Sequence, residues 1–187
     1  MEFNFAQVFW TVARAVPESE CIVTPTRRLD YAAVADAAAR LANVLIDRGF
    51  GTVVDRSTLP NHASGQDHVA LYLHNSPEYL IGMLGSYAAR TAPFNVNYRY
   101  VAEELEYVLA DANAAVVIVH SAFAPTLAEV RDRLPSLRLI LQVPDDSGNE
   151  LLPGAEWFDE ALDAASSDLD PALEAAWSPD DLYILYT

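Results

Sequence analysis

The chain has 187 residues, of which 52% are hydrophobic and 20% charged, a composition typical of a globular domain rather than a disordered segment. It carries 11 basic residues against 27 acidic ones, a net charge of −16, and every basic residue is an arginine. Proteins recognise nucleic acids through basic patches, so this charge argues against nucleic-acid binding. The absence of lysine excludes a phosphate-loop lysine within these residues, and the single cysteine, Cys21, excludes an internal disulfide.

The first predicted element is a helix from about Phe5 to Val16, which Pro17 ends. Its apolar face is expected to consist of Phe5, Val8, Phe9 and Val12. Two short β-like runs follow at residues 21–24 and 28–31, and the Pro-Thr pair between them predicts a hairpin.

The second helix has the clearest amphipathic pattern in the chain, with apolar residues from Val34 to Leu45 at helical spacing. Asp30 is placed to cap its N-terminus, and Gly49 stands where a left-handed residue is favoured after the C-terminus. Residues 50–67 mix Gly, Ser, Pro, Asn and charged residues without a period, which predicts an exposed loop.

The middle of the chain alternates between strand and helix patterns with short connections. Residues 114–119 are apolar on both sides, as expected of a strand covered on two faces. This alternation predicts a doubly wound parallel α/β sheet with helices on both faces. The predicted strands are 69–73, 91–96, 114–119 and 137–143, and the predicted helices are 77–89, 102–109 and 123–134.

The last part of the chain changes in character after Arg138, the last basic residue. Residues 144–181 are acidic and rich in Pro and Gly, so we expect an irregular connection with one short helix around Trp157–Leu162. Residues 182–187 read as a buried strand. Because a natural domain rarely ends inside a buried strand, the sequence is expected to be a fragment of a longer protein.

Three patterns invite a functional interpretation. His62, His68 and His74 are evenly spaced, but six residues of strand span roughly 20 Å, too far for two of them to share a metal ion. The turn from His74 to Glu78 follows a strand and opens a helix, yet Pro77 and Glu78 are hostile to phosphate, so Ser76 is interpreted as a helix cap. Gly82 and Gly85 lie inside a predicted helix and indicate close helix packing.

Several longer strings resemble one family. Residues 65–119 contain a strand, then Asn-Ser-Pro-Glu, a helix, a "P-x-N-x-x" strand and a helix with Glu-Glu-Leu, in the order found near the N-terminus of acyl-CoA synthetases. Residues 29–49 resemble an early helix of these adenylate-forming, AMP-binding enzymes, although Ala33-Val34 stands where Glu-Leu is usual. Residues 178–187 resemble the segment that leads into their phosphate loop.

The resemblance implies that residues 1–187 are an N-terminal sub-domain of the large AMP-binding domain. It also implies that the parent protein couples a carboxylate to ATP as an acyl-adenylate and then to CoA, with magnesium as a cofactor. FNVNYRYVAEEL is most similar to ligases of fatty acids or steroid side-chain acids. Only Thr187 aligns with a functional position of the family, a threonine that approaches the phosphates or the magnesium. The alternative, which is equally favoured, is that Thr187 is a strand residue that pairs through its backbone.

No catalytic or metal-binding residue is predicted within this chain, and none of these cofactors is expected to bind the fragment tightly. The expected partners are the remainder of the parent chain and, for the fragment, a second copy of itself. We expect a cytoplasmic location, with peripheral membrane association of the parent left open. The alternatives are a stand-alone acidic α/β interaction module without catalytic activity and, less favoured, an independent nucleotide-binding domain.

Overall fold

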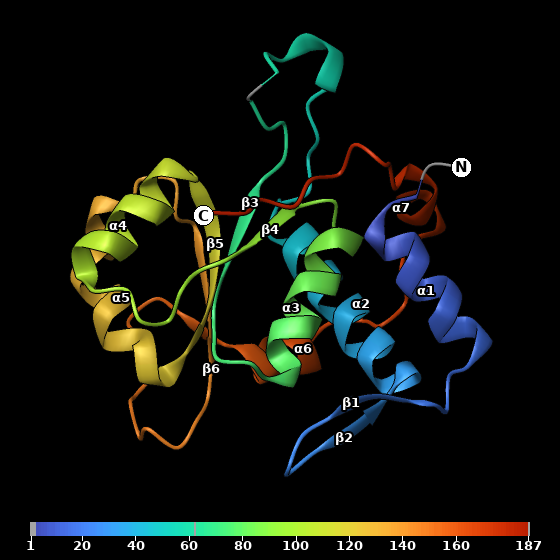
Figure 1. Ribbon diagram of the computed structural model, residues 1–187, viewed down its shortest axis with the longest axis horizontal. Coiled ribbons are helices and arrows are strands. Elements are labelled where there is room, and N and C mark those ends of the chain that lie inside the picture. The colour runs from blue at the N-terminus through green and yellow to red at the C-terminus, as the bar shows by residue number, and fades with distance from the viewer. Residues whose placement is uncertain (1–2, 62, 187) are drawn as a thin grey trace.

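A five-stranded parallel sheet lies at the centre of the computed structural model, which describes residues 3–61 and 63–186 (Figure 1). The strands run in the order β4-β3-β5-β6-β7, and each neighbouring pair is parallel. The prediction of a doubly wound parallel sheet is therefore confirmed. The strand bounds are β3 His68–Tyr72, β4 Ala92–Asn95, β5 Ala114–His120, β6 Leu139–Val143 and β7 Glu156–Trp157.

Helices cover both faces of the sheet and enclose two separate apolar cores. In Figure 1 the sheet is seen nearly edge-on, with α4 and α5 on one side and α1, α2, α3 and α6 on the other. The bounds are α1 Phe5–Ala15, α2 Tyr31–Asp47, α3 Pro77–Ala88, α4 Ala102–Asp111, α5 Ala124–Val130, α6 Phe158–Asp163 and α7 Pro171–Ala176. Three short 3-10 turns complete the list, η1 Arg56–Thr58, η2 Ser121–Phe123 and η3 Arg131–Arg133.

Helices α2 and α3 start and end where the sequence predicts. The Asp30 carboxylate accepts a hydrogen bond from the backbone N–H of Ala33 at 2.8 Å, and Ser76 caps α3 in the same way. Gly49, two residues after the end of α2, has a positive φ of 81°, which costs glycine little.

The two helices approach closely because α3 carries small residues on the contact face. A Cβ atom added to Gly85 would lie 2.8 Å from Leu41 Cβ and 2.9 Å from the carbonyl oxygen of Ala38, both on α2. A Cβ atom at Gly82 would meet the ends of two side chains, Leu71 Cδ2 at 2.9 Å and Ile118 Cδ1 at 3.3 Å. The predicted close packing is thus present, and it is tightest at Gly85.

Helix α1 has the expected bounds but the opposite buried face. Ala6, Trp10 and Ala13 are buried, whereas Phe5 is 62% and Val8 48% exposed. The prediction that Phe5, Val8 and Val12 form the core face is therefore wrong. The two alanines let the helix lie close to its neighbours, and Trp10 packs against Trp177 with ring centroids 5.4 Å apart.

Two further segments surround this core. Strands β1, Glu20–Val23, and β2, Arg28–Asp30, pair in an antiparallel hairpin as predicted. Residues 51–61 and 63–66 belong to a loop that projects from the body at the top of Figure 1. The Arg56 guanidinium donates to the carbonyl oxygens of Pro60 and Asn61 at 2.8 and 2.7 Å, which ties the loop to itself.

The end of the described chain departs from the predicted buried strand. Residues 182–186 make one isolated parallel bridge, between Ile184 and Phe94 of β4, and Leu185 is 63% exposed. A single bridge does not make a strand, so this prediction is wrong in that respect. Thr187 lies outside the described residues. The short strand β7 and helix α7 were not anticipated from the sequence.

The close contact at Gly85 makes Gly85→Ala a test of the α2–α3 packing. Alanine normally stabilises a helix interior relative to glycine by about 1 kcal/mol. Here the added methyl must displace backbone and Cβ atoms of α2, so we expect Gly85→Ala to lower the free energy of unfolding by about 1–3 kcal/mol. Urea denaturation is the measurement.

Gly82→Ala is the matched control for this variant, because its added methyl meets the ends of two side chains and no backbone atom. We expect it to cost clearly less than Gly85→Ala. A Gly85→Ala chain as stable as the wild type would contradict the described approach of the two helices.

Candidate functional site

The candidate site lies at the carboxyl ends of β3 and β5. In doubly wound sheets, ligands commonly bind at this position. The chain passes from β3 outward to β4 and then returns to β5 on the other side of β3, so the strand order reverses between β3 and β5. The crevice outside such a switch point is the usual ligand position. His74, just after β3, and His120, the last residue of β5, both lie at this point.

The two histidines are connected by a hydrogen bond. The backbone N–H of His74 donates to His120 Nδ1 at 3.0 Å, so the proton of the neutral imidazole is on Nε2. Burial lowers the pKa of His120, and the nearby charges of Asp145 and Glu78 oppose this shift only in part. His120 is therefore a neutral ring whose Nε2–H is a hydrogen-bond donor.

Aromatic rings gather around these histidines, and we call His74, Tyr98, His120 and Phe123 the aromatic cluster. The His74 ring centroid lies 4.7 Å from that of Tyr98 and 4.6 Å from that of Phe123. Tyr98 is 39% exposed, and the Arg99 guanidinium lies 5.5 Å from its ring centroid. The arrangement offers a planar surface and a cation at the switch point.

The turn before α3 is structural, as the sequence analysis predicts. Ser76 accepts a hydrogen bond from the backbone N–H of Tyr79, and Pro77 occupies the first turn. Glu78 is 7% exposed and forms an ion pair with Arg27 of the β1–β2 hairpin. Burial raises the pKa of Glu78, but hydrogen bonds from its own backbone N–H, from Arg27 and from Ser76 outweigh burial and hold the pKa below its usual value.

The histidines do not form a metal centre in the described part of the chain. No group of three potential metal-ligating side chains occurs among residues 3–61 and 63–186. His68, at the start of β3, uses Nδ1 to contact the carbonyl oxygen of Ala112, which lies at the opposite edge of the sheet from His74. His62 lies outside the described residues.

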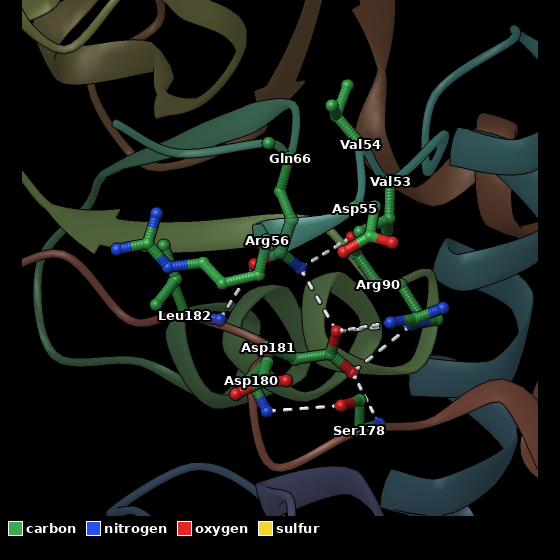
Figure 2. A pocket seen from close by; sticks show the side chains of 11 residues that line it. Val53, Val54, Asp55, Arg56, Gln66, Arg90, Ser178, Asp180, Asp181 and Leu182 are labelled. Atoms are coloured by element: carbon green, nitrogen blue, oxygen red, sulfur yellow. Dashed lines mark hydrogen bonds and ion pairs between the residues drawn. The ribbon is translucent and has the colours of Figure 1, made fainter. Parts of the chain in front are cut away.

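A buried carboxylate fastens the last described segment to the body of the protein. The Asp181 side chain is 1% exposed and accepts hydrogen bonds from Arg90 Nη2 at 2.9 Å and Arg90 Nε at 3.1 Å. It also accepts from Asn4 Nδ2 and from the backbone N–H of Ser178, each at 3.0 Å. Figure 2 shows Asp181 between Arg90 and Gln66, with the Arg56 side chain pointing away. We call Asn4, Gln66, Arg90 and Asp181 the Asp181 anchor.

Arg90 adopts a backbone conformation that normally favours glycine. Its φ is +57°, and its N–H donates to the carbonyl oxygen of Tyr87 while Thr91 N–H donates to that of Ser86. These bonds form a Schellman motif at the end of α3. A non-glycine residue in the left-handed region costs about 1–2 kcal/mol. The bidentate contact with Asp181 is the compensating interaction.

A small cavity of about 290 Å³ lies beside this anchor. Its walls come from the loop at Val53–Arg56, from Gln66 and Arg90, and from residues 178–182 (Figure 2). The Arg90–Asp181 ion pair bounds this cavity, which lies between the projecting loop and the segment that leads to Ile184.

Comparisons with known proteins agree with this architecture. The family model of AMP-binding enzymes matches residues 9–187. The chain is 45% identical over 185 residues to the medium-chain acyl-CoA ligase Mig of Mycobacterium avium, covering 99% of this chain and 33% of that protein. It is 31% identical over 186 residues to a medium/long-chain-fatty-acid–CoA and 3-oxocholest-4-en-26-oate–CoA ligase of Mycobacterium marinum, covering 98% of this chain and 32% of that one.

A solved structure shows the same arrangement. The N-terminal domain of FACL13 from Mycobacterium tuberculosis superimposes with a TM-score of 0.76 at 26% identity, over 99% of this chain and 42% of that one. The chain belongs to the family of AMP-binding enzymes. It spans about a third of the length of the curated acyl-CoA ligases that it matches. Within the described residues, no helix has the length and apolarity that crossing a membrane requires.

The position of His120 leads to a test at mildly acidic pH. Because the pKa of His120 is lowered in the folded chain, the unfolded chain binds its proton more readily as the pH falls below about 6.5. Stability contributed by the neutral ring is complete above that value and is lost as the pH falls through the lowered pKa. We expect His120→Asn, which retains an acceptor for the His74 N–H, to lose less stability between pH 7.5 and pH 5 than the wild type.

Guanidinium denaturation of both chains at a series of pH values is the measurement. The other titrating groups are common to the two chains, so their effects cancel in the difference. Parallel stability curves would show that His120 is not kept neutral by the fold.

Proposed function

We propose that this chain is the N-terminal portion of an ATP-dependent acyl-CoA ligase. In this reaction a carboxylate attacks ATP to give an acyl-adenylate and pyrophosphate, and the thiol of CoA then displaces AMP to give the thioester. The observation that carries the proposal is the 45% identity to a medium-chain acyl-CoA ligase across nearly the whole chain. Coverage of about a third of that relative supports the assignment to a portion of the enzyme.

We further propose fatty acids or steroid side-chain acids as the substrates of the longer protein. Two relatives are named as ligases of these acids, at 45% and 31% identity. Within this chain the two apolar cores are filled by their own side chains, so the acyl chain is expected to bind largely against other parts of the enzyme.

The geometry at the carboxyl ends of β3 and β5 supports a role in nucleotide binding. A base stacks on an exposed aromatic ring, and an arginine pairs with phosphate; Tyr98 and Arg99 offer both groups side by side. We propose that the aromatic cluster contributes to the nucleotide-binding side of the longer ligase. Following the family resemblance, we also propose that Thr187 approaches the phosphates or the magnesium ion.

The 187-residue chain alone is proposed to be inactive. Phosphoryl and adenylyl transfer rest on positioned cations that neutralise charge on the phosphates. The sequence has no lysine, and ten of its eleven arginines are engaged in ion pairs or in hydrogen bonds to carbonyl oxygens that hold the fold together. Arg99 is the remaining one, and a single arginine does not supply the set of positioned cations that this chemistry requires.

ATP–pyrophosphate exchange tests this function directly. We expect no exchange by the 187-residue chain above a no-protein control, with medium-chain, long-chain or steroid acids. We expect acid-dependent exchange by the longer protein encoded at the same locus. Exchange by the short chain would refute its inactivity, and a longer protein that never exchanges would favour the acidic interaction module instead.

We also propose that the isolated chain self-associates through the segment beside β4. Leu185 is 63% and Tyr183 37% exposed there, and exposed apolar side chains on a sheet edge invite pairing with a second copy. The net charge of −16 opposes association at low ionic strength, and salt screens this repulsion.

Association should therefore increase as salt rises from about 10 to 150 mM, where the screening length falls from about 30 to 8 Å. Sedimentation velocity of the wild type, of Leu185→Glu and of the control Ser147→Glu decides the matter. The Leu185 variant is expected to remain a monomer and the control to behave as the wild type. Equal behaviour of both variants would contradict this surface.

A further inference from the structure

The Asp181 anchor collects contacts from parts of the chain that are far apart in sequence. Asn4 belongs to the cap of α1, Gln66 to the end of the projecting loop, and Arg90 to the end of α3. The hydrogen bond from Asn4 Nδ2 to Asp181 joins residues separated by 177 positions. Asp181 is the point at which all three meet the C-terminal segment.

We infer that Asp181 is a positioning residue, which sets the path of residues 182–186 along β4 and thereby the point from which the chain continues. This inference rests on the proposed function, in which the phosphate-binding loop follows this segment. A side chain that fixes the start of the segment also fixes where such a loop begins.

The residues after Asp181 are held one after another by different elements. The Leu182 N–H donates to Gln66 Oε1 at 2.7 Å, so the anchor itself holds the first residue of the segment. The Ile184 N–H donates to the carbonyl oxygen of Pro93 at 3.1 Å. Tyr183 and Tyr186 donate through their hydroxyls to Asn95 Oδ1 at 3.2 Å and to Asp111 Oδ2 at 2.7 Å.

Among these contacts, the one at Asp181 is an ion pair with a buried carboxylate. The two tyrosine hydrogen bonds lie at the surface, and the β4 contact is a single backbone bridge. The Asp181 carboxylate is 1% exposed and saturated with donors from Arg90, Asn4 and Ser178. Loss of its charge would leave the Arg90 guanidinium, which is only 19% exposed, without its ionic partner, so the segment depends on Asp181 more than on its other contacts.

The strained backbone of Arg90 points to the same role. The equivalent position after α4 is Asn113, with φ +48°, a residue type that tolerates the left-handed region. Glycine or asparagine would serve the end of α3 equally well, yet an arginine occupies it and directs its guanidinium to Asp181. Strain of this kind persists where a specific contact requires the side chain.

Hydrogen exchange in the 187-residue chain tests the inference without reference to activity. Asp181→Asn keeps the shape of the side chain and removes its charge. We expect the Leu182 and Ile184 amides to exchange at least tenfold faster in this variant, whereas Val117 in the centre of β5 keeps its protection. Asp180→Asn is the matched control, since Asp180 is the adjacent exposed acid and its carboxylate makes no hydrogen bond among those of the described residues.

Arg90→Gly provides a second variant that removes the strain together with the guanidinium. A residue with a purely local role at the end of α3 would be improved by glycine, so the segment would remain protected. We expect the same release of Leu182 and Ile184 as in Asp181→Asn. Unchanged exchange in either variant, or an equal acceleration that includes Val117, would overturn the positioning role.

Kinetics of the longer ligase then separate the two proposals. We expect Asp181→Asn to raise KM for ATP at least tenfold or to lower kcat, while KM for the acid changes little. We expect Asp180→Asn to keep KM for ATP, KM for the acid and kcat near the wild-type values. If ATP kinetics are unchanged in Asp181→Asn, the positioning role is refuted although the enzyme is a ligase. If the wild-type longer protein does not activate acids, the proposed function fails, and hydrogen exchange alone still decides the role of Asp181.

Discussion

Burial of β5 on both faces is the constraint on which the rest of the fold depends. All seven residues from Ala114 to His120 are buried, and β5 pairs with β3 and β6 on its two edges. A strand without a solvent face requires helices on both sides, and each buried Val or Ile side chain contributes about 1.5–3 kcal/mol. The parallel pairing also requires crossover connections, and their direction reverses between β3 and β5, where the aromatic cluster lies.

The Asp181 anchor adds to this core a connection that apolar packing does not supply. A buried ion pair contributes little net stability because both charges lose their hydration. The ion pair acts on geometry instead, because the planar guanidinium of Arg90 donates two hydrogen bonds and so fixes the orientation of the Asp181 carboxylate. The polar contacts of Asp181 therefore determine where the C-terminal segment lies, while the two apolar cores determine whether the sheet forms at all.

The sequence predicts those parts of the molecule whose signals are local. The caps at Asp30 and Ser76 and the apolar run of β5 lie within a few residues of the elements that they define. The buried face of α1 was not predictable from hydrophobicity alone, because two alanines and Trp10 pack inward while larger side chains face solvent. A two-residue strand such as β7 carries too short a pattern to be recognised.

The sequence predicts only part of the candidate site, because residues far apart in the chain form it. The turn at His74 was placed at a ligand-binding position, but its neighbours Tyr98 and Phe123 come from two other strand–helix connections. Nothing in the sequence separates the anchoring Asp181 from its exposed neighbour Asp180. Both become distinct only when Arg90, 91 positions earlier, is brought beside one of them.

The exclusive use of arginine has a chemical consequence beyond ion pairing. All the ion pairs within the described residues have arginine as their cation. A guanidinium remains protonated at every physiological pH and is a poor nucleophile, whereas the ε-amine of lysine loses its proton readily when buried and is the common target of acetylation. Thioesters and mixed anhydrides acylate amines, and no side chain in this sequence carries one. The side chains of this sequence therefore offer no amine to the activated acyl compounds that acyl-CoA ligases form.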